Sequence, residues 1–298
     1  GRFSPFRPKF AIDVKFLKEV LPDGIRFALP NFVVSISGNM YTLILGKYYT
    51  VRDVGFFSQA AKFNTYGSSV TLNMLRNVSQ PMLVQVKNNR EECLKAFRKL
   101  VRFTVFVSFP SMLGLSLVAP ELIYLILTPK WLFSAYILRI ICIGGAFTAL
   151  NTLFTYYFAS QNMSSLYMWL GISVSTFRIP LAVIASFGGV MTLAYVCTAY
   201  DVIIVTVYYL FSKKSLGYSL KMFMADALPI ILVVISALIF AYFITKGIEN
   251  IYILLISKVI IVSFIFITAL HFLRYDIYME TRDIVFKYVN RLWLRICK

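Results

Sequence analysis

The sequence predicts an all-α membrane protein, a polytopic helical bundle of about eight transmembrane helices. Hydrophobic residues make up 59% of the 298 positions, and only 14% are charged. A soluble domain has about 45–50% apolar and about 25% charged residues, so a water-soluble fold has no place for this excess of apolar surface. The apolar residues also gather in long runs that short basic segments separate.

Eight stretches approach or exceed the roughly 20 apolar residues that an α-helix needs to cross a bilayer. The first two carry many polar residues, and hydropathy alone supports them less than the other six. The predicted spans are 27–45, 54–78 with a helical extension toward 86, 103–126, 132–157, 166–187, 190–211, 224–245 and 251–273.

The basic residues between these spans predict the orientation, because short segments rich in Lys and Arg are seldom translocated. Most of the 30 Lys and Arg residues lie in one alternating set: 1–26, 87–102, 158–165, 212–222 and 274–298. The opposite set of connections holds only Lys47, Arg52, Lys130 and Lys246. Both ends of the chain are therefore predicted to be cytoplasmic.

The same pattern divides the chain into four parts. We expect a basic cytoplasmic link at 1–26, a six-helix transmembrane lobe at 27–222, two further transmembrane helices at 223–273 and a basic cytoplasmic tail at 274–298. Within the lobe, 87–102 is a basic amphipathic segment suited to the cytoplasmic headgroup layer. The chain begins without Met, and we expect it to be the downstream portion of a longer protein.

Composition and motifs exclude several classes of protein. A disulfide scaffold or a zinc cluster is not expected, because Cys93, Cys142, Cys197 and Cys297 have no close pair spacing and His271 is the single histidine. No phosphate-binding glycine loop occurs, so we expect no nucleotide and no other cofactor. The basic residues interrupt apolar runs instead of covering a soluble face, which argues against nucleic-acid binding.

The connections on the predicted outer side are short, at 46–53, 127–131, 188–189 and 246–250. An enzyme that builds or ligates glycans outside the cell normally needs a larger external segment. We therefore expect a transporter and not an enzyme, with its function between the helices.

One face of the second span is polar. Its polar residues repeat at intervals of three and four, which is typical of one helix face: Gln59, Lys62, Tyr66, Ser69, Asn73, Arg76 and Gln80. Polar groups in hydrocarbon cost several kcal/mol unless they face protein or water. The hypothesis is that this polar stripe lines a hydrated cavity, and the alternative is interhelical hydrogen bonding. The first span adds a smaller set that could face the same space: Asn31, Ser35, Gly38, Asn39 and Thr42.

Charged residues also occur inside later spans. Arg178 and Asp201 lie at matching depths on consecutive antiparallel helices, so they form either a structural ion pair or a substrate- or ion-responsive site. Lys258 is predicted to snorkel to the interface, and Arg139 either to snorkel or to face a cavity. With more cations than anions, a shared cavity would attract an anion. The predicted substrate-binding residues are Lys62, Arg76, Arg139, Arg178, Asn39, Gln59, Asn73 and Gln80, and the predicted ion-coupling residue is Asp201.

Three segments of the chain resemble a known family: 54–86, the following KNNREECLKAFRKLVRF, and 110–141. They are similar to the polysaccharide transporter branch of the multidrug/oligosaccharidyl-lipid/polysaccharide exporter superfamily, the Wzx-like O-antigen and capsule flippases. The resemblance is strongest from 27 to 160. The matching features are Gly55 with the aromatic-Ser-x-Ala stretch after it, Pro81, the basic helix, Pro110, Gly114, Ala119, Lys130 and Trp131.

The resemblance implies a fold of two six-helix lobes around a central cavity, often followed by two further helices. The eight spans would be the second lobe plus that final pair, and the partner would be the missing N-terminal lobe of the same protein. It also implies movement of an undecaprenyl-diphosphate-linked oligosaccharide across the bacterial inner membrane, in contact with membrane lipids. Three alternatives stay open: a multidrug cation antiporter of the same superfamily, a membrane glycan polymerase or ligase, and a non-transporting scaffold.

Overall fold

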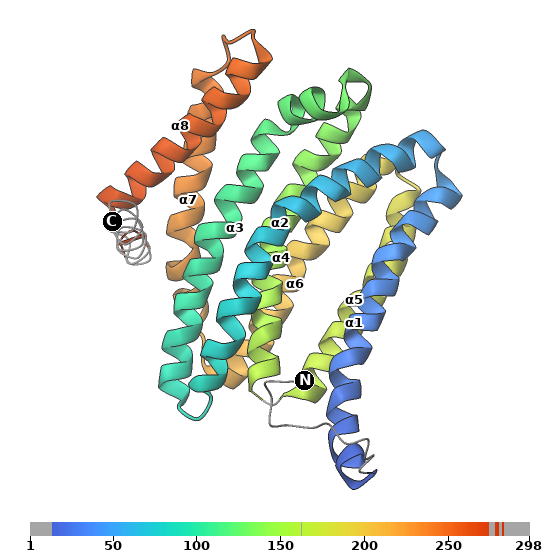
Figure 1. Ribbon diagram of the computed structural model, residues 1–298, viewed down its shortest axis with the longest axis vertical. Coiled ribbons are helices and arrows are strands. Elements are labelled where there is room, and N and C mark those ends of the chain that lie inside the picture. Colours follow the sequence, from blue (N-terminus) through green and yellow to red (C-terminus); the bar gives the residue numbers. More distant parts are fainter. Residues whose placement is uncertain (1–13, 162, 274–277, 280–281, 283–298) are drawn as a thin grey trace, which may run out of the picture.

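A computed structural model describes residues 14–161, 163–273, 278, 279 and 282 (Figure 1). Most of the predicted link and tail, and Cys297, lie outside the described residues. The described part of the chain forms eight long helices, a short 3-10 turn at Pro129–Trp131 and no strand. The long helices are α1 (Val14–Tyr48), α2 (Val51–Gln85), α3 (Arg90–Leu127), α4 (Leu132–Ser160), α5 (Ser164–Ser186), α6 (Val190–Leu216), α7 (Leu220–Ile244) and α8 (Ile251–Phe272).

The predicted fold class, an all-α polytopic bundle, is confirmed. Seven of the described helices are long and apolar enough to cross a membrane, and α2 is the exception. At 35 residues α2 is about 50 Å long, which exceeds the thickness of a bilayer core. It lacks the required hydropathy because the polar stripe occupies one of its faces.

Short polar residues determine where several helices begin. At the start of α3, the Asn89 side chain accepts hydrogen bonds from the backbone N–H groups of Glu91 and Glu92, as is usual for an N-cap. The basic segment predicted at 87–102 therefore leads directly into α3, and its residues from Arg90 onward are the first turns of that helix. At the C-terminal end of α6, Gly217 adopts a left-handed conformation with φ of 77°. Glycine adopts this conformation without steric cost.

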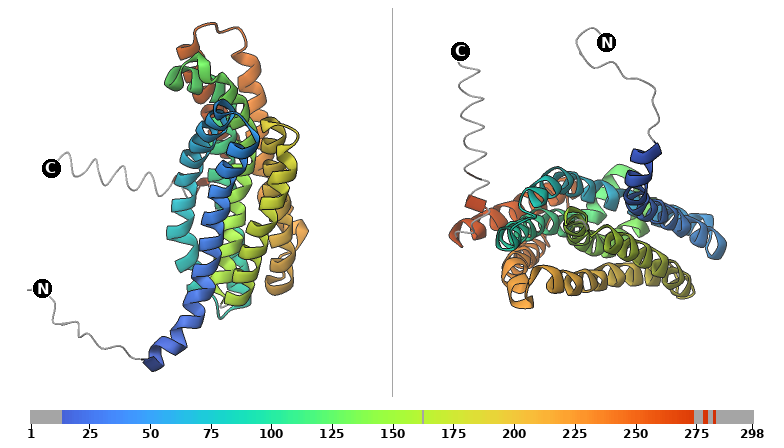
Figure 2. Two further views of the ribbon diagram at one scale, coloured as in Figure 1. Left: turned by 90° about the vertical axis from the view of Figure 1, so that its right-hand side faces the viewer. Right: turned by 90° about the horizontal axis from the view of Figure 1, so that it is seen from below.

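Helix α4 is the centre of the bundle. In its apolar window 61% of the residues are buried, against 22–33% in the other candidate spans. It packs against α2, α3 and α6, while α1 lies beside α5 at one edge of the molecule. Helices α7 and α8 lie at the opposite edge, against α3 (Figures 1 and 2). Small residues on α4 allow this close packing, as in other membrane bundles.

At Gly145 of α4, side chains of α2 and α3 pack closely against the helix backbone. A Cβ atom added there would lie 2.4 Å from Met112 Cε and 2.6 Å from Asn64 Oδ1. We expect Gly145→Ala to lower the free energy of unfolding by about 1–3 kcal/mol, because it overpacks this contact. The measurement is the thermal unfolding midpoint of the detergent-purified protein. Gly114→Ala on α3 is the matched control, since no atom lies within 4 Å of its added Cβ, and an equal midpoint for both variants would contradict the prediction.

A buried ion pair joins α8 to α3. Lys258 Nζ lies 2.5 Å from Glu121 Oε1, and the two side chains are 6% and 7% exposed. The prediction that Lys258 snorkels to the interface is wrong, because the lysine finds a carboxylate inside the bundle. The sequence alone did not predict this pair, because 137 positions separate the two residues.

A second buried carboxylate joins α7 to α3. The Asp226 side chain is 3% exposed and accepts two hydrogen bonds from Arg98, at 2.8 and 2.9 Å. Arg102 Nε lies 3.4 Å away, and the Tyr218 hydroxyl donates a further hydrogen bond at 3.1 Å. Burial and the adjacent Asp226 carboxylate raise the pKa of Tyr218, which keeps the hydroxyl protonated as a donor. The two terminal helices are therefore attached to the lobe by charge pairs as well as by apolar packing.

Candidate functional site

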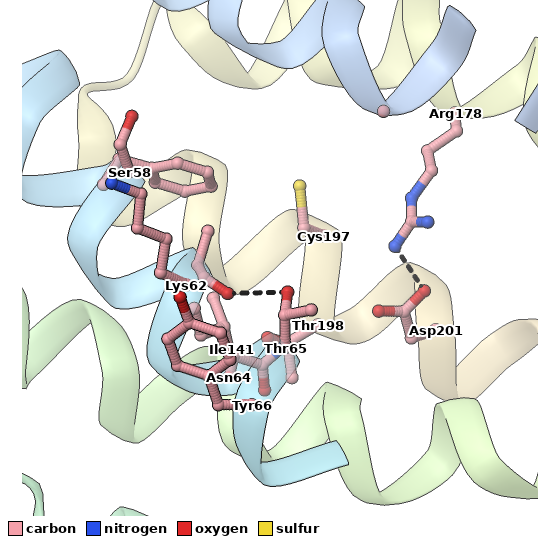
Figure 3. A pocket seen from close by; sticks show the side chains of 13 residues that line it. Ser58, Lys62, Asn64, Thr65, Tyr66, Ile141, Arg178, Cys197, Thr198 and Asp201 are labelled. Carbon is pink, nitrogen blue, oxygen red and sulfur yellow. Dashed lines mark hydrogen bonds and ion pairs between the residues drawn. The ribbon is translucent and has the colours of Figure 1, made fainter. Parts of the chain in front are cut away.

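A cavity of about 530 Å³ lies among α1, α2, α4, α5 and α6, and we call it the central cavity (Figure 3). Most of its lining comes from the first half of α2 and from the middle of α6. The lining residues are Gly38, Phe57, Ser58, Ala61, Lys62, Asn64, Thr65, Tyr66, Ile141, Arg178, Cys197, Thr198 and Asp201. Three predicted site residues thus share one space: Lys62, Arg178 and Asp201.

Arg178 and Asp201 form an ion pair across the gap between α5 and α6. Arg178 Nη2 lies 2.6 Å from Asp201 Oδ1, and Figure 3 shows the arginine side chain extended toward the carboxylate. The side chains are 34% and 18% exposed, so the pair is partly shielded from water. The predicted match in depth is confirmed, and the pairing brings the two charges into contact.

Close packing of α4 against α6 holds Asp201 in place. A Cβ added at Gly144 would lie 3.1 Å from Asp201 Oδ2 and 3.3 Å from the Thr198 Cα atom. The amide of Asn151 donates a hydrogen bond to the Asp201 carbonyl at 3.1 Å, and Thr198 Oγ1 donates to the Ile140 carbonyl at 3.1 Å. Two hydrogen bonds, one at Thr198 and one at the Asp201 carbonyl, therefore fix this part of the α6 backbone against α4.

Lys62 gives the central cavity a net positive charge. Its side chain is exposed, and within the described part of the chain it makes no ion pair. Among the described lining residues, the charged groups are two cations, Lys62 and Arg178, and one anion, Asp201. Because Asp201 already neutralises Arg178, the charge of Lys62 is left to attract an anion.

The other predicted residues whose side chains the structure describes do not line the central cavity. Arg76 and Gln80 line a separate groove of about 540 Å³ on α2, together with Asn77 and Gln85. Arg76 lies 14 positions beyond Lys62, which is about 21 Å along the helix. The helical period kept these side chains on one face, but the length of α2 separates them into two sites.

The four remaining predicted substrate-binding residues are Asn39, Gln59, Asn73 and Arg139, and they lie on three different helices. Asn73 is exposed and Gln59 half-buried on α2, and Arg139 is half-buried on α4. The Arg139 carbonyl accepts a hydrogen bond from Ser116 at 2.9 Å. The side chain of Asn39 lies outside the described part of the chain. Their role in binding stays a prediction.

Sequence reasoning missed polar residues of the cavity wall. Asn64 and Thr65 lie on the turns between Gln59 and Tyr66, yet they face the same cavity, because a cavity wall covers more of a helix than one narrow stripe. It also missed the buried acids Glu121 and Asp226. An acidic residue inside an apolar span was the available signal, since such residues normally face protein and pair with a cation.

Comparisons with known proteins agree with this fold. Residues 2–136 match a family described as "Polysaccharide biosynthesis protein". The chain is 25% identical over 130 residues to an "Uncharacterized membrane protein in cps region" of Klebsiella pneumoniae, covering 44% of this chain and 27% of the relative. It is 21% identical over 218 residues to the "Teichuronic acid biosynthesis protein TuaB" of Bacillus subtilis (strain 168), covering 73% and 44%. The chain thus spans less than half the length of these relatives.

A solved structure has the same fold. The chain superposes on "Lipid II flippase MurJ, inward closed conformation" with a TM-score of 0.68 and 19% identity, over 90% of this chain and 57% of that one. The fold and the apolar helices define a multi-pass membrane protein. The sequence matches confirm the predicted resemblance to a polysaccharide biosynthesis family of membrane proteins, and the solved structure confirms the fold.

Proposed function

We propose that this chain is part of a flippase for a lipid-linked oligosaccharide, an undecaprenyl-diphosphate glycan that supplies surface polysaccharide biosynthesis. The cargo moves from the cytoplasmic to the periplasmic leaflet of the bacterial inner membrane. The observation that carries the proposal is the central cavity, where Lys62 and Arg178 face one space inside a bundle of apolar helices. The family match and the likeness to a lipid II flippase support the same reading.

The cavity chemistry fits a phosphate-bearing headgroup. Arginine presents a planar fork of donors to phosphate oxygens, and lysine adds a point charge. At about 530 Å³ the central cavity has room for a diphosphate but not for an oligosaccharide. The sugars therefore lie outside it, along the exposed face of α2 that carries Asn73 and Gln80.

The exposed face of α2 supports the presence of a facing lobe. Tyr66 is 68% exposed, and Asn73, Arg76 and Gln80 are also exposed. Because such a face is costly against lipid tails, we assign it to a water-filled space between this lobe and an N-terminal lobe of the same protein. Rocking of one lobe against the other would then alternate access to the cargo. The distribution of basic residues supports cytoplasmic placement of both chain ends.

The alternatives fit less well. A cation antiporter needs carboxylates in its cavity, and of the described lining residues only Asp201 is acidic. The buried acids are already paired with cations: Glu121 on α3 with Lys258 on α8, and Asp226 on α7 with Arg98 on α3. A glycan polymerase or ligase needs a larger external segment than the short connections between these helices provide.

Reconstitution tests the proposal directly. The full-length protein is placed in liposomes that contain a fluorescent lipid-linked oligosaccharide, and protein-free liposomes are the control. We expect the label to move between leaflets at least tenfold faster than in the control, without any new glycosidic bond. Glycan elongation, or drug-cation uptake without leaflet transfer, would replace the flippase assignment with one of the alternatives.

A further inference from the structure

A second cavity lies beside the central cavity, nearer the end of the bundle where α4 and α6 end. Its volume is about 310 Å³, and we call it the hydroxyl cavity. The central cavity contains Ser58 and Cys197, each about 10 Å from the first residue of its helix, α2 or α6. The hydroxyl cavity contains Thr155 and Tyr208, about 8 and 12 Å from the last residues of α4 and α6. Because α6 runs through both, the cavities extend toward opposite ends of the bundle.

The Arg178–Asp201 ion pair lies where the two cavities meet. Gly38, Arg178 and Asp201 line both of them. Gly38 contributes no side chain, and no atom lies within 4 Å of the position that a Cβ would take. Arg178 and Asp201 are about 21 and 22 Å from the end of the bundle where α5 begins and α6 ends. The ion pair therefore borders both spaces, close to the middle of the helices.

The wall of the hydroxyl cavity is suited to water. Thr148, Thr152 and Thr155 donate their hydroxyl protons to carbonyls of α4 at 2.8 to 3.0 Å, which leaves hydroxyl oxygens as acceptors. Asn151 Oδ1 is buried and has no hydrogen-bond partner among the residues that the structure describes. A buried polar cavity of this size normally holds water that satisfies such groups.

We infer that the two cavities form a second polar path through the lobe, one for water and small inorganic ions, and that the Arg178–Asp201 pair closes it. The path goes beyond the proposed flippase function, because it lies inside one lobe whereas the glycan passes outside the central cavity. Its two chambers hold about 530 and 310 Å³, which admits hydrated ions but not an oligosaccharide. Separation of the two side chains joins the chambers.

Thiol labelling from each side of the membrane tests this path. Two variants of the full-length protein carry a single cysteine on a background without other cysteines: native Cys197 in the central cavity, or Thr155→Cys in the hydroxyl cavity. A cationic, membrane-impermeant methanethiosulfonate is applied to sealed vesicles of either orientation. With the ion pair intact, we expect each cysteine to react from one side only, and the two sides to be opposite.

Removal of the barrier should abolish this sidedness. In Arg178→Gln/Asp201→Asn we expect each cysteine to react from both sides, with at least a tenfold faster rate from the side that was closed. The charge swap Arg178→Asp/Asp201→Arg should restore one-sided labelling. The control removes a different buried pair, Glu121→Gln/Lys258→Gln, and should leave the sidedness unchanged. None of these labelling measurements requires the glycan, so their results do not depend on the proposed cargo.

Two results would overturn the inference. One is labelling of Thr155→Cys from both sides while the ion pair is intact, and the other is one-sided labelling of both cysteines after the pair is removed. Folding is checked in the same vesicles with native Cys142 as the single cysteine, since that residue is fully buried and stays unreactive in a folded variant. If the double variant exposes Cys142, Asp201→Asn alone provides the same comparison with a side chain of equal size.

Discussion

Replacing Lys62 by Gln in the full-length protein is expected to lower leaflet transfer of the lipid-linked oligosaccharide roughly tenfold or more. A hydrogen bond to a charged group contributes about 1.5–3 kcal/mol, which corresponds to this loss for one phosphate contact. Lys62 is exposed on the central cavity and makes no ion pair within the described part of the chain, so its removal leaves no opposite charge unpaired. Adding Arg178→Gln/Asp201→Asn should bring transfer to the protein-free level.

The control for this prediction is a lysine of equal charge that is remote from the cavity. Lys246→Gln lies in the exposed connection between α7 and α8 and is expected to leave transfer within about twofold, as surface substitutions usually do. Arg76→Gln should cost less than Lys62→Gln, because its groove is separate from the central cavity. Equal losses for Arg76→Gln and Lys62→Gln would instead favour the whole polar stripe as the binding surface.

The fold was largely predictable because membrane helices have strong sequence signals. Long apolar runs and alternating basic segments predicted the eight helices of the described chain, with ends that differ by several residues or turns. The largest differences are at α1 and α3, which begin at Val14 and Arg90 although the predicted spans begin at 27 and 103. Helix length depends on capping and on neighbouring helices, whereas hydropathy reports only the part that fits in lipid.

The site was predictable only in part. The helical period of a sequence shows which residues share one face of a helix, but it does not show which other helix packs against that face. The distances of Arg178 and Asp201 from the ends of their helices were sufficient to predict that they lie at the same depth, since α5 and α6 are consecutive and antiparallel. The same reasoning could not pair Glu121 with Lys258, because α3 and α8 are distant in sequence. It also could not divide the α2 stripe between two sites, since that division depends on which helices cover each turn.

Lys258→Met is expected to lower the free energy of unfolding by about 3–5 kcal/mol, the usual result of removing one partner of a buried ion pair. The lysine is 6% exposed and its partner Glu121 is 7% exposed, so the remaining carboxylate is left in a poorly solvated place between α3 and α8. Within the described part of the chain, Glu121 Oε2 already has no hydrogen-bond partner, which makes the loss of Lys258 harder to compensate. Denaturant or thermal unfolding of the purified protein in detergent measures the change.

The double variant separates the cost of an unpaired charge from the cost of lost packing. Glu121→Met/Lys258→Met has nearly the same volume and no buried charge, so it should recover most of the stability that Lys258→Met loses. Lys246→Met, in the exposed connection before α8, should change stability by no more than about 0.5 kcal/mol. If the double variant were as unstable as the single one, the pair would itself supply the attachment of α8 to α3. If Lys258→Met were neutral, Glu121 would have reached water or taken up a proton, and the charge of Lys258 would not be needed to hold α8 against α3.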